Sequence, residues 1–289
     1  MKVKAAIPSA YEPLFFFMRD VKHPPYRYFD LEGGRSSGKS TTVALALVLE
    51  GSIYPTRILC GREYQNSIKD SVKKLLEDTI NRYGITGYTT TLDSIRHENG
   101  TEFIFKGFHD NLEATVKSFE GIQRCWVEEA QTVSKESLNV LLPTIRADGS
   151  TIIFTRNPLT PEDEITRRFV TNATELTAQR TYHVHTTWRD LLKVHALPNE
   201  VLQQVKEAEG TPDFAHVWEG LPYEKTLNQI ISWESLRQAT LRTPDIEGGY
   251  GFGVDVARYG NDRTALTIKH GNIWKRSTHG MAPVLPKAP

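Results

Sequence analysis

Short apolar runs alternate with longer amphipathic segments along the first half of the chain. The runs 26–31, 57–61, 125–127 and 151–154 have the length and composition of buried strands. Helical spacing of apolar residues follows in 41–49, in 66–82 and, after Ser134 as an N-cap, up to Leu142. This alternation predicts an α/β fold with a mostly parallel sheet covered on both faces by helices.

The rest of the pattern predicts a hairpin and two further units. Asn99-Gly100 separates the strand-like segments 94–97 and 102–105, which predicts a hairpin at an edge of the sheet. Residues 187–243 have helical character, and Pro198 is a favourable helix start. Segments 251–257 and 264–268 are strand-like, and Ile273-Trp274 begins a third strand. The prolines of 277–289 should keep that last segment out of any sheet or helix.

Composition narrows the classes of protein to consider. No apolar run approaches the roughly 20 residues of a membrane span, and no signal-peptide pattern opens the chain, so we expect no membrane contact and a cytoplasmic location. Cys60 and Cys125 lie in short apolar runs, which favours buried thiols over a metal or redox site.

Charge is balanced, with 35 Lys and Arg against 35 Asp and Glu. The chain therefore has no global positive field for nucleic acid, and any such contact must be local. Two basic clusters are candidates for this contact, although each could equally be an ordinary solvated surface: Arg57, Arg62, Lys69, Lys73 and Lys74, and further on Arg156, Arg167 and Arg168.

The most specific motif is Gly33-Gly34-Arg35-Ser36-Ser37-Gly38-Lys39-Ser40, which fits G-x-x-x-x-G-K-[ST] between a predicted strand and a predicted helix. In such a loop the glycines let backbone N–H groups turn toward the phosphates of ATP. Lys39 neutralises the β- and γ-phosphates, and the Ser40 hydroxyl reaches Mg²⁺ at the start of the helix. The phosphate-binding segment includes the next residue, Thr41. An ordinary Gly/Ser-rich loop is the alternative, and the flanking strand and helix disfavour it.

A pair of acids, Glu128 and Glu129, ends the apolar strand at 125–127. In phosphate-loop ATPases one carboxylate at such a position holds Mg²⁺ through water, and the next orients and deprotonates the attacking water. We assign Glu128 to the metal and Glu129 to the water. Asp is commoner at the metal position, and without the upstream loop the pair would be an ordinary surface feature.

Three further residues have both a chemical and a plain interpretation. Arg35, inside the loop, could reach the γ-phosphate as an arginine finger in cis or simply face solvent. Asn157 could sense the γ-phosphate, although Asn157-Pro158 is also a good turn. Asp255 lies in an apolar strand-like run, where a carboxylate is costly to bury, and is therefore a metal-ligand candidate.

Taken in order, these motifs resemble the large subunit of a tailed-phage terminase of the PBSX type. The resemblance rests on the loop, on Lys117-Ser118 ahead of the acidic pair, and on the segments 142–146, 157–158 and 253–257 with 260–262. It implies a RecA-like P-loop ATPase domain at 1–187, a linker subdomain at 188–243 and an RNase H-like nuclease unit at 244–289. Arg35 would be the finger, Asn157 the coupling residue and Asp255 the first nuclease carboxylate.

The resemblance also implies cofactors and partners. ATP and Mg²⁺ would power the movement of double-stranded DNA through the portal protein into a procapsid. The partners would be the portal, the terminase small subunit and further copies of this chain in a ring on the portal, all in the host cytoplasm. The nuclease site would take Mg²⁺ or Mn²⁺ if its ligands were complete.

One departure concerns the nuclease unit. No Asp or Glu follows Asp262, whereas two-metal hydrolysis needs several converging carboxylates. We therefore expect a nuclease stub, left by truncation, a frameshift or an artificial boundary, that does not cut DNA. Two other interpretations stay open: another P-loop NTPase acting on nucleic acid, such as a helicase, and an inactive prophage remnant.

Overall fold

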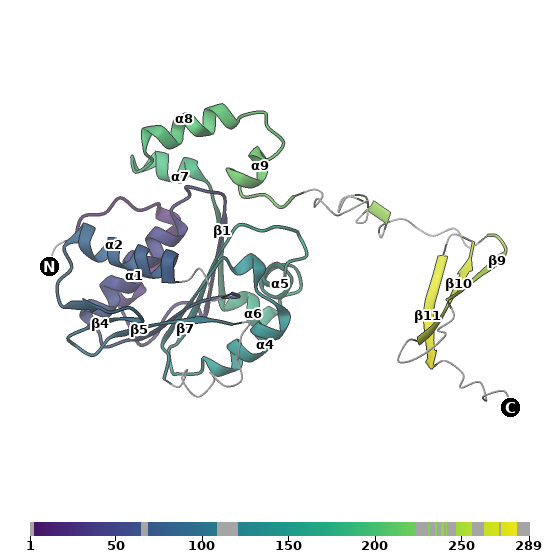
Figure 1. The fold of residues 1–289 in the computed structure, drawn as a ribbon, viewed down its shortest axis with the longest axis horizontal. Helices are drawn as coiled ribbons and strands as arrows, with labels where there is room; N and C mark the ends of the chain where they lie inside the picture. The colour runs from purple at the N-terminus through teal and green to yellow at the C-terminus, as the bar shows by residue number, and fades with distance from the viewer. Residues whose placement is uncertain are drawn as a thin grey trace. The chain divides into compact units, whose positions relative to one another are not determined.

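A computed structural model describes residues 3–64, 69–108, 121–223, 231, 235, 238–239, 241, 247–255, 263–271 and 273–281. The chain separates into two compact units, Met1–Thr226 and Leu227–Pro289 (Figure 1). Most residues around 243 lie outside the described ranges, so the division at 187 and 243 stays a prediction. Within those ranges, no helix is long and apolar enough to cross a membrane.

The larger unit is built on one eight-stranded sheet with the order β3-β4-β5-β2-β6-β7-β1-β8. Every pairing from β5 to β8 is parallel, while β3 and β4 form an antiparallel edge. This confirms the mostly parallel sheet and the hairpin of β4 and β5, but the strand at the edge is β3, which was not predicted, so the hairpin lies one strand in from the edge. The strands are β1 (Tyr28–Gly33), β2 (Arg57–Arg62), β3 (Tyr88–Thr90), β4 (Ser94–His97), β5 (Glu102–Gly107), β6 (Arg124–Glu128), β7 (Thr151–Arg156) and β8 (Thr181–Thr186).

Both faces of this sheet are covered, as predicted. Along β6, Cys125 and Val127 belong to one apolar cluster and Trp126 to the other, because successive side chains of a strand point to opposite faces. One face carries η1 (Ser9–Met18), α1 (Lys39–Ile53), η3 (Lys69–Lys73) and α2 (Lys74–Tyr83). The other carries η5 (Ala130–Thr132), α4 (Lys135–Thr144), α5 (Glu164–Thr166) and η6 (Arg167–Thr171), followed in the chain by α6 (Glu175–Gln179) (Figure 1).

Two local predictions are confirmed in these helices and strands. The Ser134 hydroxyl accepts a hydrogen bond from the backbone N–H of Ser137 at 3.1 Å and so caps α4. Cys60 and Cys125 are both buried free thiols. The helix expected over 66–82 differs in detail, because its described part opens with a π-helical turn, η3, before α2.

The segment after β8 is helical, as expected. It contains α7 (Trp188–Lys193), α8 (Asn199–Ala208), which has Pro198 as its N-cap, and α9 (Phe214–Val217). These helices pack around Trp188, Val205 and Trp218. Because α9 ends close to the phosphate loop in space, this segment contributes to the site.

The smaller unit contains an antiparallel sheet in the order β11-β10-β9, formed by β9 (Tyr250–Asp255), β10 (Arg263–His270) and β11 (Ile273–Met281). The prediction that residues 277–289 avoid sheet structure is wrong for 277–281, because Met281 pairs with Arg263. The first proline of that segment is Pro283, so nothing in 277–281 removes a backbone donor.

Candidate nucleotide-binding site

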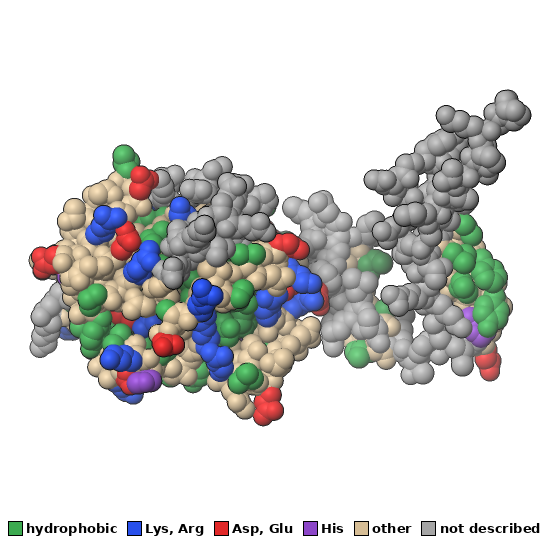
Figure 2. All heavy atoms as spheres, turned by 90° about the horizontal axis from the view of Figure 1, so that it is seen from below, with side chains coloured by type: hydrophobic (Ala, Val, Ile, Leu, Met, Phe, Trp, Pro, Cys, Tyr) green, Lys and Arg blue, Asp and Glu red, His purple; other side chains and the backbone are tan. Residues whose placement is uncertain are grey.

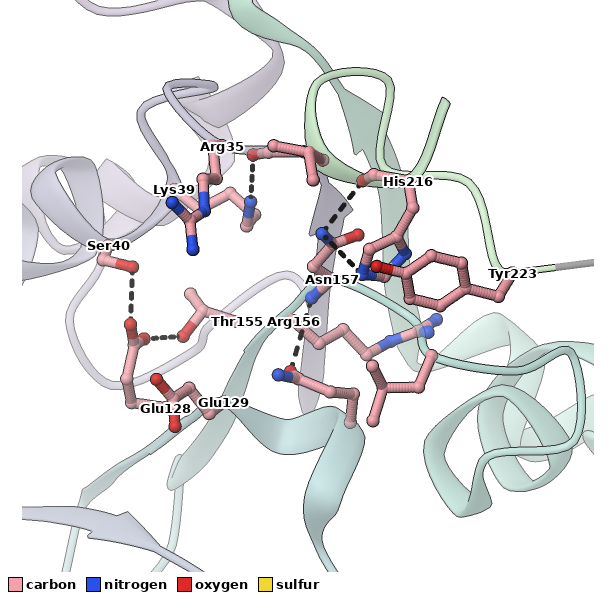
Figure 3. Close-up of a pocket in the computed structure, with 14 residues that line it drawn as sticks. Arg35, Lys39, Ser40, Glu128, Glu129, Thr155, Arg156, Asn157, His216 and Tyr223 are labelled. Carbon is pink, nitrogen blue, oxygen red and sulfur yellow. Dashed lines mark hydrogen bonds between the residues drawn. The ribbon is translucent and has the colours of Figure 1, made fainter. Parts of the chain in front are cut away.

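A pocket of about 350 Å³ opens where β1, β6 and β7 end (Figure 3). The carboxyl ends of parallel strands are where α/β sheets bind ligands. Most of the lining comes from the phosphate loop, the acidic end of β6, the end of β7 and the region of α9: Gly34, Arg35, Lys39, Ser40, Glu128, Glu129, Gln131, Thr155, Arg156, Asn157, Leu159, His216, Val217 and Tyr223. The predicted site residues of three separate segments therefore meet.

The Lys39 amine is held by the loop that contains it. Its Nζ donates to the carbonyl oxygens of Gly33 at 2.7 Å and Gly34 at 2.8 Å, and to Ser37 Oγ at 3.0 Å. Burial lowers the pKa of this amine to about 8, against the attraction of Glu128 and Glu32. Lys39 thus lines the pocket as a desolvated cation, which suits it to pairing with an anionic phosphate.

The first two glycines of the loop are needed for a reason beyond phosphate binding. A Cβ on Gly33 would lie 1.9 Å from the carbonyl oxygen of Thr186 at the end of β8, and one on Gly34 would lie 2.3 Å from that of Trp218. In addition, the Arg35 N–H donates to the Val217 carbonyl at 2.7 Å. Neighbouring backbone therefore packs directly against the loop, and only glycine fits there.

We expect Gly34→Ala to destabilise the larger unit by about 3 kcal/mol, the upper end of the usual cost of overpacking, because the clash is with backbone. Gly84→Ala is the control: Gly84 follows α2 with nothing within 4 Å of its Cβ position, so only the left-handed strain of about 1 kcal/mol applies. Urea unfolding curves measure both values. Equal costs for the two variants would contradict the close approach.

Ser40 and Glu128 meet at the mouth of the loop. The Ser40 hydroxyl donates to Glu128 Oε1 at 2.8 Å, and the Thr155 hydroxyl donates to Oε2 (Figure 3). Burial raises the pKa of the Glu128 carboxyl above its usual range, although both hydrogen bonds and the charges of Arg62 and Lys39 oppose that shift. The surrounding positive charge therefore does not fully offset the desolvation of this partly buried carboxylate, which favours a further cation at this position.

Glu129 directly follows in an unusual backbone conformation. Its φ of 53° and ψ of 43° are left-handed, a region that costs a non-glycine residue about 1–3 kcal/mol and is common at functional sites. The half-exposed carboxylate pairs with the Arg62 guanidinium of β2 at 2.7 Å. The turn therefore sends the two adjacent glutamates in different directions, one buried against Ser40 and one toward the open pocket.

Arg35 and Asn157 also line this pocket. Figure 3 places the exposed Arg35 guanidinium beside Lys39, and no hydrogen bond or ion pair joins its side chain to another described residue. The Asn157 amide donates to the His216 carbonyl at 3.0 Å, which leaves Asn157 Oδ1 buried and without a partner among the described groups. His216 in turn stacks on Tyr223 with ring centres 3.8 Å apart.

His216, Tyr223 and Arg62 were given no role in this site by the sequence. His216 and Tyr223 reach it only because α9 folds back on the phosphate loop. Arg62 reaches it because β2 and β6 are neighbours in the sheet. No local sequence pattern predicts these contacts between segments that lie far apart in the chain.

The structure removes Arg156 from the candidate nucleic-acid contacts. Its side chain is fully buried and pairs with Asp30 at 2.7 Å, Glu32 at 2.6 Å and Asp163 at 3.3 Å. Arg167 and Arg168 both pair with Glu164, at 3.3 and 3.0 Å.

The first basic cluster is likewise engaged in contacts within the chain. Arg57 pairs with Glu102 at 3.8 Å, Arg62 with Glu129, Lys73 with Glu77, and Lys74 with Asp78 at 3.5 Å. The side chain of Lys69 lies outside the described residues. On the described surface visible in Figure 2, Lys and Arg side chains lie scattered among acidic ones. The described side chains of these clusters therefore form ion pairs within the chain rather than a dedicated basic patch.

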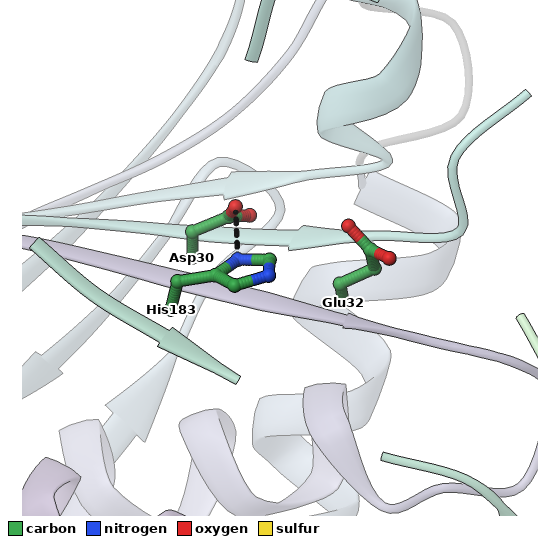
Figure 4. Close-up of side chains that lie close together, drawn as sticks. All are labelled: Asp30, Glu32 and His183. Atoms are coloured by element: carbon green, nitrogen blue, oxygen red, sulfur yellow. Dashed lines mark hydrogen bonds and ion pairs between the residues drawn. The ribbon is translucent and has the colours of Figure 1, made fainter. Parts of the chain in front are cut away.

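Asp30, Glu32 and His183 bring possible metal-ligand atoms within 4.8 Å of one another on β1 and β8 (Figure 4). The Arg156 guanidinium already forms ion pairs with both carboxylates. Burial alone would raise the pKa of Asp30, but hydrogen bonds from Arg156 and His183 outweigh it and hold that pKa below its usual range. We therefore assign this cluster to a buried ion-pair network rather than to a metal.

Replacing Arg156 with Met should cost about 3–5 kcal/mol of unfolding free energy, because the buried Asp30 and the partly buried Glu32 lose their countercharge. In the wild type, the lowered pKa values of Asp30 and Glu32 contribute stability that is present above about pH 4 and is lost as the pH falls through the folded values. Urea unfolding from pH 3 to 7 tests both points. An Arg156→Met curve that keeps the full wild-type acid dependence would contradict the assignment.

Asp255 is the last residue of β9, opposite Ala265 of β10. Its side chain lies outside the described residues, as do Lys117-Ser118 and 260–262, so its role in a nuclease stays a prediction.

The strand order, the phosphate loop between β1 and α1 and the acidic end of β6 define a RecA-like P-loop NTPase domain. The family model described as phage terminase large subunit matches residues 26–218. The chain belongs to the phage terminase large subunit family.

Curated relatives agree with this membership. The chain is 31% identical over 198 residues to the PBSX phage terminase large subunit of Bacillus subtilis (strain 168), covering 62% of this chain and 45% of the relative. It is 24% identical over 282 residues to the terminase large subunit of Bacillus phage SPP1, covering 93% of this chain and 64% of that relative. The chain thus spans about half to two thirds of these proteins.

Two crystal structures of the large terminase from a thermophilic bacteriophage share the fold. One, in complex with ADP, matches with a TM-score of 0.60 and 14% identity over 95% of this chain and 69% of the other. The second matches with a TM-score of 0.59 and 14% identity over 97% and 69%.

Proposed function

We propose that this chain is the ATP-hydrolysing motor part of a phage terminase, which couples ATP hydrolysis to the movement of double-stranded DNA into a procapsid. The observation that carries the proposal is the 2.8 Å contact between Ser40 Oγ and Glu128 Oε1 beside the Lys39 amine. Family membership and the relatives' names support the packaging role.

The donor set fits Mg²⁺. A hydroxyl oxygen and a carboxylate oxygen are the hard ligands that Mg²⁺ prefers when it also contacts nucleotide phosphates. Ser40 and Glu128 would hold the ion, which when bound neutralises charge on the β- and γ-phosphate oxygens. Because Ser40 lies in the first turn of α1, the positive end of the helix dipole adds to the attraction for phosphate.

The remaining residues then have separate tasks in hydrolysis. A water oxygen forms a bond to the γ-phosphorus as the bond to the β–γ bridging oxygen breaks, giving ADP and phosphate. Glu129 takes the proton of that water, and the Lys39 amine moves from the loop carbonyls to the phosphate oxygens. Arg35 contacts the γ-phosphate, and Asn157 passes the change in the site to His216 and α9.

The proposed setting follows from the same role. The partners are double-stranded DNA held transiently, the portal protein, the terminase small subunit and further copies of the chain in a ring on the portal. The location is the host cytoplasm. The scattered charge of the described surface supports a transient rather than a permanent hold on DNA.

Phosphate release by the purified chain, measured with Mg²⁺ and ATP and with or without linear double-stranded DNA, tests the proposal. We expect hydrolysis that depends on Mg²⁺ and rises when linear double-stranded DNA is added. Stimulation by single strands alone would favour a helicase-like NTPase. Absence of turnover in a folded, monodisperse preparation would favour an inactive remnant.

A further inference from the structure

The hydroxyl of Tyr11 contacts the phosphate loop from a segment that the sequence motifs did not include. Tyr11 lies in η1 and is fully buried. Its hydroxyl donates to the backbone carbonyl of Ser37 at 3.1 Å and also contacts the Thr186 hydroxyl at the end of β8. A residue 26 positions upstream thus holds the backbone of the loop directly.

The two hydroxyls have one proton each, which restricts how they bond. Thr186 Oγ1 lies closer to the Tyr11 oxygen than to its other acceptor, the Glu32 carbonyl at 3.3 Å. With Thr186 donating to the Tyr11 oxygen, the Tyr11 proton is left for Ser37 O, and both contacts of Tyr11 are satisfied. Burial raises the pKa of Tyr11 to about 12, so the phenol keeps that proton throughout the physiological range.

The bond to Ser37 fixes one peptide plane of the loop. In a trans peptide the carbonyl of one residue and the N–H of the next point in opposite directions. With the Ser37 carbonyl turned to Tyr11, the N–H of Gly38 points away from Tyr11. Gly38 has a φ of 85°, a left-handed conformation that glycine adopts readily. Backbone N–H groups at this position in phosphate loops bind phosphate, so the orientation of the Ser37-Gly38 peptide determines where the Gly38 N–H points.

A second tyrosine anchors the same segment without touching the loop. The Tyr182 hydroxyl of β8 donates to the carbonyl of Ala10 at 2.8 Å. Leu14 and Phe17 of η1 are also buried in the core. The segment is therefore attached in several ways, and among its described hydrogen bonds the one from the Tyr11 hydroxyl joins it to Ser37.

We propose that Tyr11 is a positioning residue for nucleotide binding, which holds the Ser37-Gly38 peptide in the orientation that receives the phosphates of a nucleoside triphosphate. This inference rests on the proposed ATPase function. It makes η1 part of the nucleotide site rather than a passive cover of the sheet.

The test compares Tyr11→Phe with Tyr182→Phe, since each loses one hydroxyl that anchors η1 and keeps its ring. For Tyr11→Phe we expect KM for ATP and Kd for ADP to rise about 3- to 10-fold, the effect of one hydrogen bond, with kcat within about twofold of wild type. For Tyr182→Phe we expect both constants to stay at the wild-type value. Melting temperatures report the shared structural cost of losing either hydroxyl.

Thr186→Val is a second test of the proposal if Tyr11→Phe folds poorly, because it removes the hydroxyl next to Tyr11 at constant side-chain shape. It should raise Kd for ADP, by a smaller factor than the one expected for Tyr11→Phe. Equal changes in KM for the two tyrosine variants, or no change in Tyr11→Phe, would overturn the proposal while leaving the ATPase function intact. Failure of the wild-type chain to bind ADP or hydrolyse ATP would overturn both.

Discussion

Lys39→Ala should lower ATP hydrolysis by at least about 100-fold, the usual cost of removing one charged or hydrogen-bonding group aimed at the transition state. The Lys39 amine is the cation that the loop carbonyls hold beside Glu128, whereas the neighbouring Arg35 guanidinium is exposed and is not held by these carbonyls. Phosphate release under saturating Mg²⁺ and ATP measures the loss.

The fold should survive this change. Burial lowers the pKa of Lys39 to about 8, which means that the charged amine is disfavoured in the folded state, and removing it relieves that cost. We expect a melting temperature within about 4 °C of wild type. Normal turnover in a folded Lys39→Ala chain would contradict the assignment of the phosphate loop.

Glu129→Gln should keep Mg-ATP binding and lower hydrolysis by about 100- to 10,000-fold, the range expected for loss of a general base. The amide preserves the shape of the side chain but cannot accept the proton of the attacking water. Because Glu129 is half-exposed and the amide oxygen of the introduced glutamine still accepts a hydrogen bond from Arg62, the substitution should change stability little. Single-turnover hydrolysis and ATP titration separate the two effects.

Glu128→Gln is the matched comparison, because it makes the same chemical change one residue earlier. Glu128 contacts Ser40, so its loss should raise the Mg²⁺ concentration needed for half-maximal hydrolysis. The reverse pattern, with Glu129→Gln active and Glu128→Gln binding Mg-ATP tightly without turnover, would show that the two roles are exchanged.

The parallel core of the fold could be predicted from the sequence because its strands are short, apolar and buried on both faces. β2, β6 and β7 each match a predicted run within about two residues at either end. β8 was not predicted, because His183 and His185 interrupt its apolar pattern. In the structure their side chains pair with Asp30 and Glu32 of β1, so the strand forms through contacts that no local pattern contains.

The candidate site was predictable where its chemistry lies in one contiguous motif. The loop around Lys39 and the acidic end of β6 are of this kind, and the fold brings them together. The part of the site that the sequence did not predict depends on tertiary contacts: α9 against Gly34, Tyr11 against Ser37 and Arg62 against Glu129. The prediction of Arg156 as a nucleic-acid contact was wrong, because the sequence does not distinguish a buried arginine from a surface arginine.

A crystal structure of this chain with Mg²⁺, ADP and a fluoride mimic of the γ-phosphate would test whether residues 33–41 and the two glutamates form the nucleotide site. We expect the phosphates within hydrogen-bond distance of Lys39 Nζ, the metal between Ser40 Oγ and the Glu128 carboxylate, and a water in line with the γ-phosphate mimic within reach of Glu129. Phosphates bound away from residues 33–41, or a metal held by Asp30, Glu32 and His183 instead, would contradict it.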